Sequence, residues 1–199
     1  MTIAIALLTV IAYLAMGLAG PHALLQAGFV PLRATEPFPF TAVPFWLTPL
    51  SATLLHGGLL HIAFNLLMLI YCGRQVEQAL GPGRTLLVYI VGAYGAALGQ
   101  YLVDPMSPAP MIGSSGAVSA LVAAYAMLFA RGDVRAVGPL SGQVVRALWL
   151  AAAWIGLQWL VSAATGGAAS PIATAAHVGG FLVGLALVRP LLAWRYRNA

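Results

Sequence analysis

Four polar residues lie inside or at the edge of strongly apolar stretches of this sequence. Ser115 occurs in the tetrapeptide GSSG at residues 113–116, His177 occurs in AHVGGFLVG, and His61 and Asn65 are four residues apart. Polar side chains are costly in apolar surroundings, so those that remain there are candidates for function. A serine hydroxyl beside an imidazole suits nucleophilic catalysis, because the imidazole takes the proton as the oxygen attacks. The sequence therefore predicts a serine hydrolase that uses Ser115 and His177.

The surroundings of Ser115 favour an accessible hydroxyl and a site for negative charge. Gly113 and Gly116 carry no side chain that would cover it. Ser115 is expected in the first turn of a helix, where backbone N–H groups have no intrahelical partner and can stabilise an oxyanion. His61 and Asn65 can add side-chain donors to the same oxygen, each typically contributing about 3 kcal/mol.

A carboxylate that would orient His177 is not expected. The acidic residues are Glu36, Glu77, Asp104 and Asp133, and all of them fall in expected loops or at the ends of apolar runs. An ionised carboxylate buried without a partner is expensive. The sequence therefore predicts a Ser–His dyad rather than a triad, with His177 as base and then as acid.

The composition places these residues in a membrane. Of 199 residues, 61% are hydrophobic and 7% are charged, and the mean hydropathy is +0.94. A soluble domain has about a quarter of its residues charged. The formal net charge of +5 comes from arginines scattered between apolar runs, which does not favour a nucleic-acid partner. The single Cys72 excludes an internal disulfide framework.

Six apolar runs predict an all-α membrane protein with a single domain over residues 1–199. A span needs about 20 apolar residues, and helices satisfy their own backbone groups in lipid. The first run has no basic residues before it, so a retained span is favoured over a cleaved signal peptide. The expected spans are residues 2–20, 58–73, 86–103, 114–130, 144–164 and 173–193.

The arginines predict the topology, because cytoplasmic loops carry an excess of basic residues. Only Arg33 lies in a connection that follows an odd-numbered span. The other eight follow spans two, four and six: Arg74, Arg84, Arg131, Arg135, Arg146, Arg189, Arg195 and Arg197. Both termini are therefore expected in the cytoplasm. Spans two, four and six then begin at the outer leaflet.

This topology brings the polar residues to one level. They lie within about seven residues of the starts of spans two, four and six, which is roughly 10 Å of depth. Gly180 and Gly184 share a helix face with His177, and such small residues let another helix approach closely. Gly116 and Ala120 give span four a matching surface.

Two loops on the outer side have distinctive compositions. The first contains prolines at 21, 31, 37, 39, 44 and 49, which exclude a long helix, and its Phe38, Phe40, Phe45 and Trp46 suit the headgroup region. The segment TGGAASPIA at residues 165–173 is expected to be a mobile cap over the site, because its small residues make few contacts.

The sequence resembles the rhomboid intramembrane proteases. The resemblance is carried by HGGLLHIAFN at residues 56–65, GSSG at 113–116 and AHVGGFLVG at 176–184, and it covers residues 46–187 including QVEQALGPGR. It implies a six-helix rhomboid bundle with a long, partly embedded first loop. It also implies that Ser115 is the nucleophile and His177 the base, and that the oxyanion hole consists of His61, Asn65 and the backbone of Ser115.

The resemblance further implies that His56 supports the first loop and that no metal or organic cofactor is used. The implied substrates are single-span membrane proteins cut near the outer end of their helix, and the implied location is the bacterial inner membrane. Two features depart from the family pattern. Leu47 follows Trp46 where many members have arginine, and Ser119 stands where some members have an aromatic residue that stacks on the histidine.

Three other functions are compatible with parts of the sequence. A catalytically inactive rhomboid-like protein would bind membrane clients without cutting them. A metal or haem protein would use His56, His61 and His177, although the spacing of five between the first two suits chelation poorly. A transporter would place its polar residues at the bilayer midplane instead of the outer leaflet.

Overall fold

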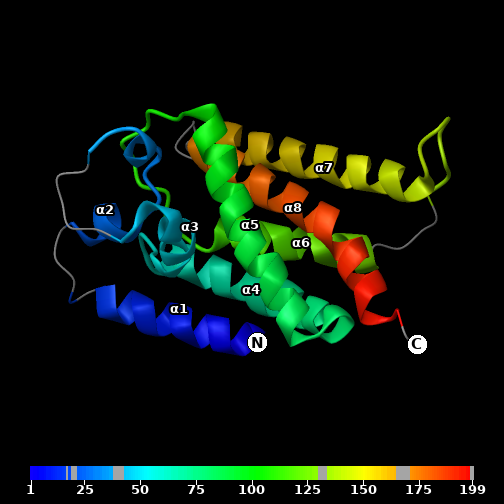
Figure 1. Ribbon diagram of the computed structural model, residues 1–199, viewed down its shortest axis with the longest axis horizontal. Coiled ribbons are helices and arrows are strands. Elements are labelled where there is room, and N and C mark those ends of the chain that lie inside the picture. Colours follow the sequence, from blue (N-terminus) through cyan, green and yellow to red (C-terminus); the bar gives the residue numbers. More distant parts are fainter. Residues whose placement is uncertain (17, 19–21, 38–42, 130–133, 165–170, 198–199) are drawn as a thin grey trace.

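The computed structural model describes residues 1–16, 18, 22–37, 43–129, 134–164 and 171–197. Helices dominate this part of the chain, and its only β-type pairings are two isolated bridges. Short helices build the first loop: α2 (Ala23–Ala27), η1 (Pro31–Ala34), η2 (Phe45–Leu47), α3 (Thr48–Ser51) and η3 (Ala52–Leu54). The body in Figure 1 consists of α1 (Thr2–Met16), α4 (Leu59–Leu80), α5 (Pro82–Val103), α6 (Ser115–Phe129), α7 (Gly142–Ala164) and α8 (Pro171–Arg195).

The helices α4 and α5 are longer than the apolar runs from which they were predicted. The expected second span stops at residue 73, where Arg74 begins a polar stretch, but α4 continues to Leu80. It does so because Val76 and Leu80 are fully buried against the core. Gly81, with φ of 83°, then ends α4, and Pro82 begins α5 at once.

The lengths of the helices suit a bilayer. Within the described residues, α4, α5 and residues Thr174–Arg195 of α8 are 22 residues each and apolar enough to cross it. At 1.5 Å per residue such a helix is about 33 Å long, close to the roughly 30 Å hydrocarbon core. The apolar helices α1 and α6 have 15 residues. The predicted count of six spans and the single-domain division of residues 1–199 remain predictions, and residues 17, 19–20 and 130 of the expected spans lie outside the described residues.

Small residues bring α5, α6 and α8 into direct backbone contact. A Cβ atom added to Gly179 on α8 would collide with the carbonyl oxygen of Gly95 on α5. Gly92 on α5 faces Ala120 on α6, where an added Cβ would lie 2.6 Å from the alanine methyl carbon. These three helices therefore form the centre of the bundle.

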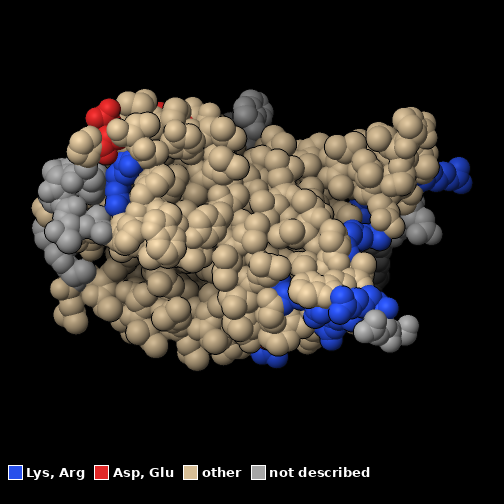
Figure 2. All heavy atoms as spheres, in the orientation of Figure 1, with Lys and Arg blue, Asp and Glu red and all other residues tan. Residues whose placement is uncertain are grey.

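The direction of the helices is clear in Figure 1. The helices α4, α6 and α8 run one way, and α1, α5 and α7 run the other. Figure 2 shows that most of the Lys and Arg atoms gather at the end where α4, α6 and α8 finish. This arrangement agrees with the charge pattern that predicted the topology, although the assignment of this end to the cytoplasm remains a prediction. Arg131 lies outside the described residues.

The first loop folds over the opposite end. Phe29 pairs with Met111 through two backbone hydrogen bonds, of 2.8 and 3.1 Å, so the loop is joined to the segment that precedes α6. The ring of Phe45 packs 5.3 Å from that of Phe29, whereas Trp46 is 67% exposed. Phe38 and Phe40 lie outside the described residues, as do residues 165–170 of the predicted cap.

Candidate active site

Ser115 is the first residue of α6 and follows a turn at Gly113. Gly113 has φ of 104°, a conformation that L side chains rarely adopt. Its N–H donates to the carbonyl oxygen of Ala52 at 2.9 Å, and a Cβ at this position would lie only 2.6 Å from His61 Nε2. Glycine is required at residue 113 both by the turn and by the closeness of the imidazole.

The structure brings Ser115 and His177 together. His177 lies on α8, and its Nε2 atom is 2.8 Å from Ser115 Oγ, a hydrogen-bond distance. Both side chains are half-buried. The two residues are 62 positions apart in the sequence, so the fold creates this contact.

Glycines on α8 permit that contact. A Cβ added to Gly180 would collide with the carbonyl oxygen of Gly116, and one added to Gly184 would collide with that of Ala120. The backbones of α6 and α8 therefore touch along the face that carries His177. The pairing of Gly116 and Ala120 with Gly180 and Gly184 is the one that the spacing in the sequence indicated.

The other predicted residues form a network with Ser114 beside the dyad. Ser114, which is fully buried, donates its hydroxyl to Asn65 Oδ1 at 2.9 Å and its backbone N–H to His56 Nε2 at 3.5 Å. Asn65 Nδ2 donates to the carbonyl oxygen of His61 at 2.8 Å. The rings of His56 and His61 meet edge to face with centroids 5.0 Å apart. This network fixes the segment that carries Ser115 against the start of α4.

The hydrogen bonding of His61 indicates which nitrogen carries its proton. The N–H of Gly57 donates to His61 Nδ1 at 3.4 Å. A neutral imidazole that accepts at Nδ1 has its proton on Nε2, the atom that lies beside Gly113. The Asn65 amide has two N–H donors, of which one is used within α4. Both side chains therefore retain a donor for a ligand near Ser115.

His56 lies in the loop before α4 and is 1% exposed. Burial is the main cause that lowers the pKa of His56 to about 4, and the nearby charge of His61 lowers it further. The imidazole is therefore neutral at physiological pH and can accept the N–H of Ser114.

Two cavities adjoin the dyad. One has a volume of about 240 Å³, lies between α5, α6, α8 and the α5–α6 loop, and is lined by Ser115, His177 and Gln100 among others. The second, of about 140 Å³, lies between α4, α6, α7 and α8 and is lined by Phe64, Trp154 and both dyad residues. The serine hydroxyl is thus accessible from two sides.

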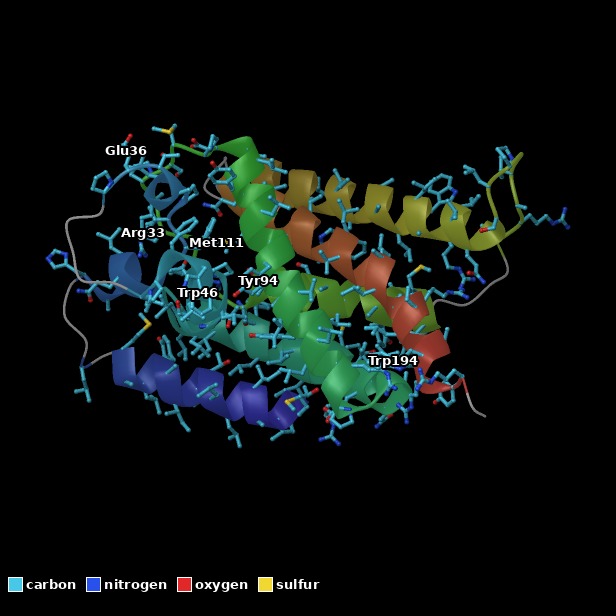
Figure 3. The ribbon with its side chains drawn as sticks, in the orientation of Figure 1. Arg33, Glu36, Trp46, Tyr94, Met111 and Trp194 are labelled. Atoms are coloured by element: carbon cyan, nitrogen blue, oxygen red, sulfur yellow. The ribbon has the colours of Figure 1, made fainter. Side chains whose placement is uncertain are left out.

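The two positions that depart from the family pattern have other contacts in this structure. In place of an arginine after Trp46, Arg33 donates to the carbonyl oxygen of Val43 at 2.7 Å, and the hydroxyl of Tyr94 on α5 donates to that of Trp46 at 2.9 Å. Figure 3 shows Tyr94 and Trp46 side by side. Ser119 does not stack on the histidine; its hydroxyl donates to the carbonyl oxygen of Ser115 at 2.8 Å.

The metal hypothesis receives no support from the side chains. Across the described ranges, no group of three or more His, Cys, Asp or Glu residues is arranged to hold an ion.

Sequence reasoning missed two buried polar residues, Ser114 and Gln100. Both were detectable, because Gln100 lies inside the expected span 86–103 and Ser114 adjoins Ser115 in the GSSG tetrapeptide. The rule that intramembrane polar residues are functional candidates applies to Gln100 as much as to Asn65.

An apolar bundle whose long helices match the bilayer, with polar residues converging at one end, defines a multi-pass membrane protein. A family model described as the Rhomboid domain matches residues 45–194. The chain belongs to the rhomboid family.

Curated relatives agree with this assignment. The chain is 30% identical over 200 residues to Rhomboid protease GlpG of Yersinia pestis (strain Pestoides F), an alignment that covers 100% of the chain and 64% of the relative. It is 31% identical over 185 residues to Rhomboid protease GlpG of Photorhabdus laumondii, covering 93% of the chain and 59% of that relative. The chain thus spans somewhat less than two thirds of the length of these relatives.

Proposed function

We propose that this protein is an intramembrane serine endopeptidase that hydrolyses peptide bonds of membrane-anchored substrates. The observation that carries the proposal is the 2.8 Å distance between Ser115 Oγ and His177 Nε2. Membership of the rhomboid family supports it, as do the relatives named as rhomboid proteases.

The proposed reaction has two halves. In the first, His177 Nε2 takes the proton of Ser115 as Oγ attacks the scissile carbonyl carbon, and then gives that proton to the leaving amine. In the second, His177 removes a proton from a water molecule, which attacks the acyl-enzyme ester, and then returns that proton to Ser115 Oγ as the ester bond breaks. No carboxylate takes part.

The developing oxyanion is assigned to the side of Ser115 that faces α4. Its proposed donors are His61 Nε2, Asn65 Nδ2 and the backbone N–H of Ser115. The protonation of His61 on Nε2 and the second N–H of Asn65 support this role. Removing one such donor typically costs about 10²- to 10³-fold in kcat.

The proposed substrates are single-span membrane proteins cut near the outer end of their helix. The proposed location is the bacterial inner membrane, with both chain ends in the cytoplasm. The bacterial relatives and the gathering of arginines at the end remote from Ser115 support this orientation.

The test is cleavage of a fluorescent single-span substrate by the purified protein in detergent. We expect the wild type to cut, and Ser115→Ala and His177→Ala to lose at least about 10³-fold of kcat/KM while keeping their thermal midpoints. A fluorophosphonate probe should label the wild type and leave Ser115→Ala unlabelled.

The outcomes separate the candidate functions. Folded wild-type protein that neither cuts several substrates nor reacts with the probe would favour an inactive, client-binding rhomboid. Variants that cut as well as the wild type would refute the dyad.

A further inference from the structure

A polar cavity lies between α7 and α8, at the end of the bundle where α7 begins and α8 finishes (Figure 1). Its volume is about 560 Å³, and its wall consists of Val134, Ser141, Gly142, Gln143, Arg146 and Arg189. Arg146 belongs to α7 and Arg189 to α8, so two helices contribute one positive charge each. Among the described residues that line the cavity, none is Asp or Glu. The cavity is therefore a concave, positively charged surface.

The charge of Arg189 lacks a balancing carboxylate in the described structure. Arg189 is half-buried, lies within the apolar segment Thr174–Arg195, and makes no ion pair within the described ranges. Beyond Asp104 the sequence contains six arginines and a single acidic residue, Asp133, which lies outside the described residues. One carboxylate can neutralise at most one of these arginines. Charged side chains within spans are usually paired, so an anion is the expected partner in this cavity.

The first turn of α7 adds hydrogen-bond donors to the same cavity. The N–H of Val144 donates to Ser141 Oγ at 3.4 Å, and that of Val145 donates to the carbonyl oxygen of Ser141 at 3.0 Å. The N–H groups of Gly142 and Gln143 precede these two and have no partner within a helix. The start of a helix also carries a partial positive charge that favours anions. The donors and the arginines thus serve the same kind of ligand.

We propose that this cavity binds a phosphate group, carried by an anionic lipid headgroup or present as free inorganic phosphate. Guanidinium groups match the oxygens of phosphate in paired hydrogen bonds. Arg189 lies 15 residues after Thr174, which is about 22 Å along α8. In a hydrocarbon core of roughly 30 Å, a long side chain at that depth reaches the headgroup region. A phosphate held by Arg146 and Arg189 together connects α7 to α8.

The lining residues also discriminate between lipid headgroups. Phosphatidylglycerol carries a phosphate and no cation. Phosphatidylcholine carries an ammonium group next to its phosphate, and the described wall offers no carboxylate to receive it. We therefore expect phosphatidylglycerol to bind more tightly than phosphatidylcholine by at least about fivefold.

The test measures the thermal midpoint of the purified protein in dodecyl maltoside. The protein is titrated with dioleoyl phosphatidylglycerol, with dioleoyl phosphatidylcholine, and with inorganic phosphate against chloride at equal ionic strength. A ligand that binds the folded state raises the midpoint in a concentration-dependent manner. A rise with phosphatidylglycerol alone identifies the ligand as a lipid headgroup, whereas an equal rise with inorganic phosphate identifies free phosphate. If neither ligand raises the midpoint, the proposal is wrong.

Variants locate the binding in this cavity. We expect Arg189→Gln to weaken binding of the effective ligand about fivefold, and Arg189→Lys, which keeps the charge, to weaken it less. Arg197→Gln is the matched control, because it removes the same charge from an exposed position near the end of the chain that does not line the cavity. Arg197→Gln should bind as the wild type does.

A second variant covers the case in which Arg189→Gln does not fold. Arg146→Gln, from the opposite wall of the cavity, should show the same loss of affinity, measured by native mass spectrometry of the bound lipid or phosphate. Equal weakening by Arg197→Gln would assign the effect to overall charge and overturn the proposal, as would full binding by Arg146→Gln. All of these measurements report binding, so they stand or fall independently of peptidase activity.

Discussion

At the scale of single residues, His56 links the stability of the folded chain to pH. The folded chain holds the pKa of His56 at about 4, whereas an unfolded chain has a histidine pKa of about 6.5. Between these values the unfolded state binds a proton that the folded state does not. The contribution of His56 to the free energy of unfolding is therefore complete above about pH 6.5 and is lost as the pH falls towards 4.

We expect the thermal midpoint of the wild type to fall between pH 6.5 and 4 more steeply than that of His56→Gln. The glutamine can still accept the N–H of Ser114 through its side-chain oxygen, but it does not titrate. His22→Gln, which makes the same substitution at an exposed histidine, is the matched control. Parallel curves for the wild type and His56→Gln would show that His56 is not the titrating group.

The residue types and their spacing selected Ser115, His177, His61 and Asn65 as candidates, and their catalytic roles remain predictions. Their hydrogen bonds were not predictable, because partners depend on how the helices rotate and pack. The Ser114 hydroxyl, one position before the candidate nucleophile, proves to be buried and bonded to Asn65. Two adjacent serines in one tetrapeptide thus have different environments, since Ser114 is fully buried whereas Ser115 is half-buried beside His177.

At the scale of the helices, the contact between α6 and α8 sets the distance within the dyad. An added Cβ at Gly184 would collide with the backbone of Ala120, whereas one at Gly156 on α7 meets nothing within 4 Å. We expect Gly184→Ala to lower the thermal midpoint and to reduce kcat by moving His177 away from Ser115. The matched control Gly156→Ala should keep kcat and should keep or raise the thermal midpoint, because alanine has a higher helix propensity than glycine by up to about 1 kcal/mol.

The effect of Gly184→Ala is measured both by cleavage kinetics and by the thermal midpoint. A fall in kcat with little change in KM would indicate a displaced dyad, because substrate binding is unaffected. If Gly184→Ala matches Gly156→Ala in both midpoint and kcat, the close approach of the two helices is not needed for activity.

Apolar runs predicted where each long helix lies, but not where α4 ends. The segment from Arg74 to Leu80 is polar in sequence, yet it continues the helix because two of its side chains reach the core. Glu77 adds a further contact, since it accepts the backbone N–H of Thr2 at 2.9 Å and so joins α4 to the start of α1. Contacts of this kind come from tertiary packing and leave no periodic signal.

At the scale of the whole molecule, the arginine asymmetry predicts which end faces the cytoplasm. Cys72 is the single cysteine and is buried, so Cys72→Ala gives a background without thiols. In that background we expect Met106→Cys, in the α5–α6 loop, to react with a membrane-impermeant maleimide in intact spheroplasts. Tyr196→Cys should react only after permeabilisation. Both wild-type side chains are exposed, at 56% and 51%. The reverse labelling pattern would show that the chain crosses the membrane in the opposite orientation.

The separation of the arginines from the dyad has a practical consequence. His177 and Arg195 are 18 residues apart on α8, which corresponds to about 27 Å along the helix axis. A negatively charged support would therefore capture the detergent-solubilised protein by its arginine-rich end and leave Ser115 facing the solution. Immobilised in this orientation, every molecule would present the same face to inhibitors screened in flow.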